Sequence, residues 1–201
     1  MLDVTAKHPE LNPAFASQAA FRALMECMAR PGELRTLDGV DAPAPFAPAT
    51  AALIKSLADY ETLIWLDPGF AAAPKVAEWV RFHTAAPIVR EPGEAVFALI
   101  AESRSLPGFA QFAQGTSEYP DRSTTLIVQI DGFSDDLNTL AMTLRGPGIK
   151  TVRDFAASPL PADFAVRMRE NRAFFPRGVD VVLIAGQQIA ALPRSVMIEE
   201  R

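Results

Sequence analysis

The sequence predicts one domain of the α/β class, in which helices cover a mixed central β-sheet. Three observations favour this fold. Segments with helical periodicity alternate with short apolar segments along the chain. Two of the apolar segments carry apolar residues on both faces, as strands in the middle of a covered sheet do. The last two apolar segments are separated only by a tight turn, so at least one pair of strands is antiparallel.

The composition is that of an ordinary globular domain. The chain has 201 residues, of which 49% are hydrophobic and 21% are charged, and no repeat or low-complexity tract divides it. This length suits one domain of roughly 100–200 residues. Lysine and arginine total 19 against 24 acidic residues, which gives a net charge of −5. Because a general nucleic-acid or anionic-membrane binder carries a basic excess, we expect neither nucleic acid nor a membrane as partner.

The first predicted element is a long helix that follows a loose segment of residues 1–12. Apolar residues recur at i, i+3, i+4 and i+7 starting from Phe21, which predicts a helix from about Pro13 to Ala29. Arg30-Pro31-Gly32 ends the helix, because proline lacks the amide hydrogen that the helical ladder needs. Glu33–Leu37 is then expected to form a short strand.

A stiff, proline-rich loop over residues 43–48 follows, with Phe46 as its anchor. It leads into a second helix that Leu53 and Leu57 line. Residues 62–66 are uniformly apolar after Thr62 and predict a buried strand.

A third helix is predicted to reach His83, because apolar residues recur with helical spacing from Val76. Four further segments are candidate strands. They are Ala95–Ile100, Thr124–Ile130, Asn138–Leu144 and Val179–Ala185. The second and fourth of them are apolar on both faces, so we expect them at the centre of the sheet.

The last helix is predicted to run from Asp163 to about Phe174. Where it stops, Phe174 and Phe175 are expected to fill the core. Residues 186–188 then predict a hairpin turn back to a strand over Ile189–Leu192.

The common catalytic signatures are absent from the sequence. It contains no His-Glu-x-x-His, no Gly-x-Ser-x-Gly and no complete Gly-x-Gly-x-x-Gly. With only His8 and His83 as histidines, no metal site is predicted. The single cysteine, Cys27, excludes an internal disulfide and favours a buried position in a reducing compartment. No apolar stretch approaches the ~20 residues that cross a bilayer, so we expect a cytoplasmic protein. Because the motifs are missing, we expect no catalytic residue, metal or cofactor.

Two short segments could nevertheless hold an anion. Residues 144–151 contain Gly, Lys and Thr, as a phosphate-binding loop does, but Ile149 separates the glycine from the lysine. We interpret this segment as a tight turn with Arg145 at its rim, and an anion site is the alternative. Arg81 and His83 place a guanidinium and an imidazole within one helical turn. They could also hold an anion, or His83 could pack while Arg81 is solvated.

Six segments follow one another in a characteristic order and spacing. They are Phe21–Gly32, Arg81–Pro87, Gly115–Gln129, Leu144–Ile149, Phe175–Asp180 and Pro193-Arg194. Together they resemble the PhnH family over almost the whole chain, from about Phe15 to Val196.

The resemblance implies a subunit of the bacterial carbon–phosphorus lyase core complex, which breaks down alkylphosphonates. In that family the subunit works with partner subunits in the step that joins a phosphonate to the ribose of ATP with loss of adenine. The resemblance also implies a homodimer of three-layer α/β/α domains, similar in fold to pyridoxal-phosphate-dependent transferases but without their cofactor. It supplies no catalytic residues.

Two functions therefore remain open at this stage. The first is an accessory subunit that docks onto its partners through an apolar surface including Phe15, Phe21 or Phe46. The second is a stand-alone phosphonate- or nucleotide-binding enzyme, whose anion site Arg81, His83 and Arg145 would line.

Overall fold

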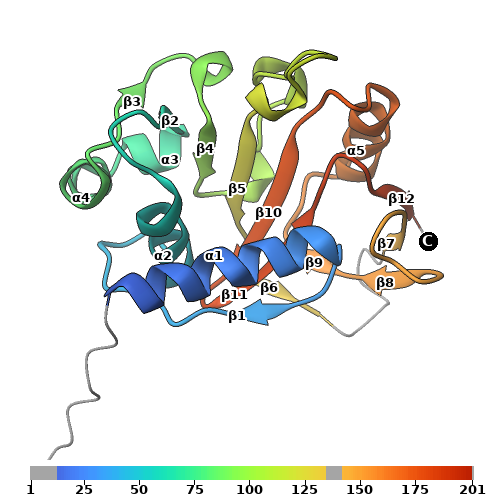
Figure 1. Ribbon diagram of the computed structural model, residues 1–201, viewed down its shortest axis with the longest axis horizontal. Coiled ribbons are helices and arrows are strands. Elements are labelled where there is room, and N and C mark those ends of the chain that lie inside the picture. The colour runs from blue at the N-terminus through green and yellow to red at the C-terminus, as the bar shows by residue number, and fades with distance from the viewer. Residues whose placement is uncertain (1–12, 135–141, 201) are drawn as a thin grey trace, which may run out of the picture.

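The structure, a computed structural model, describes residues 13–134 and 142–200 (Figure 1). In this part of the chain the central sheet has seven strands in the order β1-β11-β10-β5-β4-β2-β3. The strands are β1 (Arg35–Thr36), β2 (Ile64–Leu66), β3 (Ile88–Val89), β4 (Phe97–Ile100), β5 (Thr125–Gln129), β10 (Asp180–Ala185) and β11 (Gln188–Leu192). From β10 to β3 all neighbours are parallel, whereas β11 is antiparallel to both β10 and β1. The sheet is therefore mixed, as predicted.

Different layers cover the two faces of this sheet (Figure 1). One face carries the helices α1 (Pro13–Ala29), α2 (Pro48–Leu57), α3 (Pro68–Ala71) and α4 (Pro74–Thr84). The other face carries α5 (Phe164–Ala173) and a small sheet of β12 (Met197–Glu200), β7 (Met142–Arg145) and β8 (Arg153–Phe155). Alternate residues of β10 enter two separate cores, since Val181 and Leu183 face the α5 side and Val182 and Ile184 face the α1–α4 side. The sheet is thus buried between two outer layers.

The remaining elements are short. They are a strand pair, β6 (Gly132–Phe133) and β9 (Ala157–Ser158), and 3-10 helices at Pro92–Glu94, Ser103–Ser105, Phe109–Gln111 and Pro120–Arg122. Helices α2, α3 and α4 each begin with proline in the first turn, where the missing amide hydrogen costs nothing.

The predicted strands of the central sheet are present, and most are shorter than expected; β1, for example, spans only Arg35–Thr36. Strand β11 instead begins one residue earlier than predicted, at Gln188. The strand expected at Asn138–Leu144 corresponds to β7, which extends to Arg145. Residues 138–141, like the N-terminal segment 1–12 that was expected to be loose, lie outside the described residues. Helix α3 and strands β3, β6, β8, β9 and β12 were not predicted.

No helix within residues 13–134 and 142–200 is both long enough and apolar enough to span a membrane.

Candidate functional site

The three residues predicted to hold an anion lie on opposite faces of the central sheet. Arg81 and His83 are exposed on α4. The His83 and Trp79 ring centroids are 4.3 Å apart, and partial burial together with the nearby Lys55 ammonium lowers the pKa of the imidazole. Arg145 lies on β7 across the sheet. The structure therefore does not bring the three side chains together, and the exposed His83 ring lies against Trp79.

Arg145 stands at the rim of a tight turn, as interpreted from the sequence. The Ile149 amide donates to the Gly146 carbonyl over 3.1 Å, and Arg145 Nε lies 3.9 Å from Glu199 Oε2. Gly148 has φ +81°, and a Cβ atom there would lie 1.9 Å from the carbonyl oxygen of Ala29 at the end of α1. Glycine is needed here because the turn packs directly against the end of that helix.

Of the three aromatic residues expected at an interface, two are on the surface. Phe15 and Phe21 on α1 are 64% and 50% exposed, but Phe46 is only 3% exposed. The Phe46 ring packs edge-on against the rings of Phe70 and Trp79, with centroid distances of 5.3 and 5.4 Å. The prediction for Phe46 is wrong, because the proline-rich loop turns its aromatic side chain inward between α3 and α4.

The carboxyl edge of the parallel strands is where α/β proteins usually bind ligands, at the point where successive connections leave on opposite faces. In this chain β2 leads to α3 on one face, whereas β4 leads to Leu106 on the other. The crevice between them is filled by Asp67, which is 2% exposed. Its two oxygens accept hydrogen bonds from the Phe70 and Ala101 amides at 2.8 and 3.1 Å. Burial raises the pKa of the Asp67 carboxyl, although these amides oppose the shift.

The N-terminus of α2 lies at the same edge, and helix N-termini are common phosphate sites. Here Gln129, the last residue of β5, takes the place of a ligand. Its Oε1 accepts from the Ala47 amide (2.6 Å) and the Thr50 hydroxyl (3.0 Å), and its Nε2 donates to the Pro45 carbonyl (2.8 Å). The chain's own side chains thus occupy both usual ligand positions.

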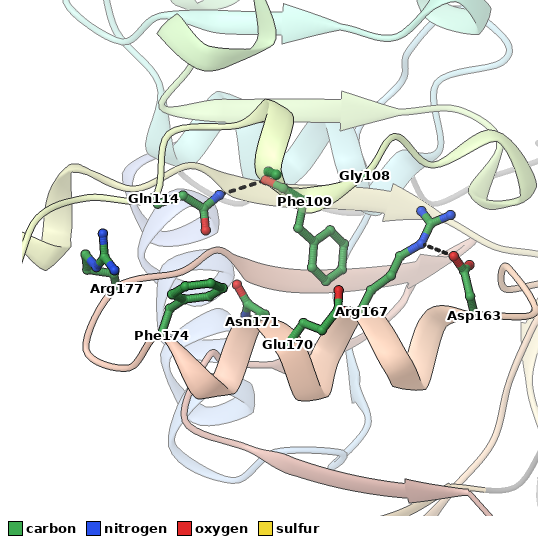
Figure 2. Close-up of a pocket in the computed structure, with 10 residues that line it drawn as sticks. Gly108, Phe109, Gln114, Asp163, Arg167, Glu170, Asn171, Phe174 and Arg177 are labelled. Carbon is green, nitrogen blue, oxygen red and sulfur yellow. Dashed lines mark hydrogen bonds and ion pairs between the residues drawn. The ribbon is translucent and has the colours of Figure 1, made fainter.

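A pocket of about 450 Å³ lies instead on the α5 side of the sheet, between α5 and residues 108–114 (Figure 2). The rings of Phe109 and Phe174 line it. The Arg167 guanidinium already has partners within the chain, because its Nε lies 2.9 Å from Asp163 and its Nη1 donates to the Leu106 carbonyl over 2.7 Å. Glu170 points across the pocket toward Phe109.

One wall of this pocket is held rigidly by Asn171, which is 3% exposed. Its side-chain amide donates to the Val179 carbonyl and its oxygen accepts from the Val179 amide, both over 2.9 Å. Gly178 has φ +123°, and a Cβ there would lie 2.6 Å from Asn171 Oδ1. The Gly178 amide donates to the Gln114 carbonyl over 2.9 Å. These bonds fix the segment 174–178 against α5 and the 108–114 loop.

A second pocket of about 340 Å³ lies on the other side of this segment, lined by Phe175, Pro120 and Arg194 among others. Arg194 forms a two-pronged ion pair with Asp180, in which Nε and Nη2 donate to the two carboxylate oxygens. Its Nη1 also donates to the Pro120 carbonyl over 2.6 Å. The segments around residues 120, 175–180 and 193–194, which carried the family resemblance, are therefore joined by one buried ion pair.

Exposed aromatic rings gather on the same surface, contrary to expectation. Phe174 and Phe175 were predicted to fill the core, but they are 55% and 52% exposed, and Tyr119 is 52% exposed. A guanidinium lies over each ring, with distances to the ring centroids of 4.2 Å for Arg122 over Tyr119, 4.9 Å for Arg172 over Phe175 and 5.5 Å for Arg177 over Phe174. We call these six residues the aromatic–arginine surface.

Sequence reasoning missed this surface, although a signal for it exists. In each of the three pairs the arginine stands three residues from its aromatic partner, which is the spacing that brings side chains together on a helical turn.

The remaining expectations concern cysteine and metal. Cys27 is fully buried, as predicted, and burial raises the pKa of its thiol to about 11. Within the described ranges, no group of three or more His, Cys, Asp or Glu side chains comes together in a way that could hold a metal ion.

Comparison with known proteins places this fold in a family. Residues 10–199 match the model of PhnH, described as a bacterial phosphonate metabolism protein. The alpha-D-ribose 1-methylphosphonate 5-triphosphate synthase subunit PhnH of Rhizobium meliloti (strain 1021) is 41% identical over 191 residues, which cover 94% of this chain and 92% of that protein. The putative C-P lyase subunit protein HtxG of Stutzerimonas stutzeri is 26% identical over 182 residues, covering 90% and 85% of the two chains. The chain therefore belongs to the PhnH family of bacterial phosphonate metabolism proteins.

Proposed function

We propose that this protein is an accessory subunit of the carbon–phosphorus lyase system. In this role it supports, together with partner subunits, the transfer of a phosphonate to the ribose of ATP with displacement of adenine, and it supplies no catalytic residue. The relative from Rhizobium meliloti, which matches this chain over almost the full length of both, is named as a subunit of the synthase that makes alpha-D-ribose 1-methylphosphonate 5-triphosphate.

The observation that carries the accessory role is that the chain's own side chains fill two usual ligand positions at the carboxyl edge of the parallel strands. Asp67 fills the crevice between β2 and β4, and Gln129 binds the backbone at the start of α2. A phosphonate or a nucleotide phosphate would have to displace these side chains, and each is held by two or more hydrogen bonds. The chain therefore has the usual α/β arrangement of strands, but its own side chains fill the positions where such folds usually bind a ligand.

A third pocket at this edge is also a poor fit for a phosphonate. It has a volume of about 390 Å³, and its lining includes Glu102, Asp131 and Arg104. Two carboxylates against one guanidinium disfavour a doubly charged anion, which needs converging cations or amides.

The test is turnover. The purified chain, incubated with ATP and methylphosphonate, is expected to give no alpha-D-ribose 1-methylphosphonate 5-triphosphate, whereas adding it to the partner subunits is expected to raise product formation. Turnover by the chain alone would overturn the accessory role, and a synthase that works equally well without the chain would overturn its role as a subunit.

We also propose that the chain acts in the cytoplasm and is a homodimer when isolated, and that Phe15 and Phe21 of α1, which were predicted to contact partner subunits, form the dimer contact instead. Their exposure on a helix face supports this, since rings of this size are favoured at interfaces. Replacing both by serine is expected to convert the dimer to a monomer on a sizing column with light scattering.

We further propose that the fold is related to that of pyridoxal-phosphate-dependent transferases and that it holds no pyridoxal phosphate. A Schiff-base lysine works in a sheltered pocket, where burial lowers its pKa. Lys55, Lys75 and Lys150 are all exposed, which supports the proposal. Incubation with the cofactor is expected to give no Schiff-base absorbance, and a stable absorbance band would contradict it.

A further inference from the structure

The aromatic–arginine surface has no role in the function proposed so far. We propose that it is the docking site for a different subunit of the carbon–phosphorus lyase system, one that presents apolar side chains flanked by carboxylates. The inference rests on the proposed function, and it adds the surface and the chemistry of the partner.

The aromatic rings of this surface are unusually exposed. Tyr119, Phe174 and Phe175 each leave about half of their surface in water, although two of them lie beside the core strand β10. Aromatic and arginine side chains are the types that most often dominate the binding energy of protein interfaces.

The aromatic–arginine surface also has a shape that suits docking. Phe174 and Arg177 line the 450 Å³ pocket on one side of their segment. Phe175 and Pro176 line the 340 Å³ pocket on the other side. The segment is therefore a ridge between two hollows, and a partner that covers the ridge can place side chains into both. Such concave, partly apolar sites receive the central anchor residues of an interface.

The ridge is held rigidly from both sides. Asn171 and Gly178 hold the ridge from the α5 side, and the Asp180–Arg194 ion pair holds it from the β10 side. A surface that is already ordered loses little conformational entropy on binding, which favours affinity.

The positive charge of the aromatic–arginine surface indicates which side chains the partner presents. Arg122 and Arg177 stack on their rings, and within the described residues neither side chain makes an ion pair or hydrogen bond. A partner that covers the rings must also remove water from these guanidiniums, which is costly unless carboxylates replace it. Four carboxylates line the two pockets, but Asp163 and Asp180 pair with Arg167 and Arg194. Asp121 and Glu170 are left to face the three guanidiniums of the surface.

A second copy of this chain is a worse fit than a different subunit. A two-fold interface places the same patch against itself, so it would bring together two sets of the same three guanidiniums. A different chain with an acidic segment avoids this repulsion and leaves α1 free for self-association.

The experiment compares variants of two surfaces after co-expression with the partner subunits, by light scattering on a sizing column. Arg122→Glu with Arg177→Glu reverses two charges that make no bond to the described protein, and Phe174→Ser with Phe175→Ser removes two rings. Tyr60→Ser with Phe82→Ser is the matched control, because it removes two rings that are 70% and 85% exposed elsewhere on the surface. We expect the control to enter the complex like the wild type. For both aromatic–arginine variants the share of the chain that elutes with the complex should fall at least ten-fold, with unchanged circular dichroism.

Three outcomes would overturn the inference while leaving the proposed function intact. The aromatic–arginine variants could enter the complex as the wild type does, the Tyr60 and Phe82 control alone could fail to enter it, or the aromatic–arginine variants could turn an isolated dimer into a monomer. Failure of the wild type to enter any complex would instead contradict the proposed function itself.

Discussion

The Asp180–Arg194 ion pair gives the sharpest prediction about stability. The two side chains are only 11% and 14% exposed, and the guanidinium donates to both carboxylate oxygens and to the Pro120 carbonyl. Replacing Arg194 by alanine leaves the Asp180 carboxylate in a largely buried position, where the backbone amide of residue 194 still donates to it.

Breaking a buried pair from one side costs about 3–5 kcal/mol, and because both groups keep some access to water we expect about 3 kcal/mol for Arg194→Ala. For a chain of this size each kcal/mol lowers the melting temperature by about 2–4 °C, so the expected fall is roughly 6–12 °C. Differential scanning calorimetry or urea titration measures it directly.

The matched control is Arg145→Ala. Its guanidinium is 48% exposed and lies 3.9 Å from Glu199, which is 65% exposed. Such surface pairs contribute about 0–1 kcal/mol, so the control should melt within roughly 4 °C of the wild type. A loss below about 1 kcal/mol for Arg194→Ala, no larger than that of the control, would refute the assignment of this pair as the joint between the three segments.

Three further predictions concern other parts of the molecule. Asn171→Ala leaves the Val179 amide and carbonyl buried without partners, so urea titration should show a loss of about 2–5 kcal/mol; a neutral effect would contradict the rigidity of the ridge. Cys27, with its pKa raised to about 11 by burial, should react with a thiol reagent at pH 8 only after unfolding, and rapid labelling of the native protein would refute its core position. Burial alone would raise the pKa of Glu33, but the Arg153 and Arg35 guanidiniums outweigh it and lower that pKa below 4.5. Glu33 therefore adds stability above that pH which is lost as the pH falls through its folded pKa. The difference in urea midpoint between wild type and Glu33→Gln should shrink on acidification, and a constant difference would argue against the ion pairs.

The central part of the fold could be predicted from the sequence because it has a clear periodic signal. Helix α1 and the strands β5 and β10 follow directly from the spacing of their apolar residues. Strands such as β6 and β9 have two residues each, which is too short for any periodicity to be visible.

The aromatic residues in loops were assigned to the wrong environments. Phe46 was placed at the surface and is buried, whereas Phe174 and Phe175 were placed in the core and are half exposed. Helical or strand periodicity determines which face of an element is apolar, but a loop has no such period. The direction of its side chains depends on distant partners, such as Trp79 for Phe46.

The candidate site could not be predicted from local sequence patterns, because its contacts join residues that are far apart in the chain. Asp67 meets Ala101 across 34 positions in the chain, and Gln129 meets Ala47 across 82. Only the topology of the sheet brings these residues together, and only their hydrogen bonds show that the two usual ligand positions are filled.

The central claim is that this protein acts as a subunit and not alone. The most direct test is the mass of the wild-type chain by light scattering on a sizing column, first in isolation and then after co-expression with the other subunits of the synthase. We predict a dimer in isolation that becomes part of a larger, stable complex when the partners are present. An unchanged mass, with the partner subunits eluting separately, would contradict the claim.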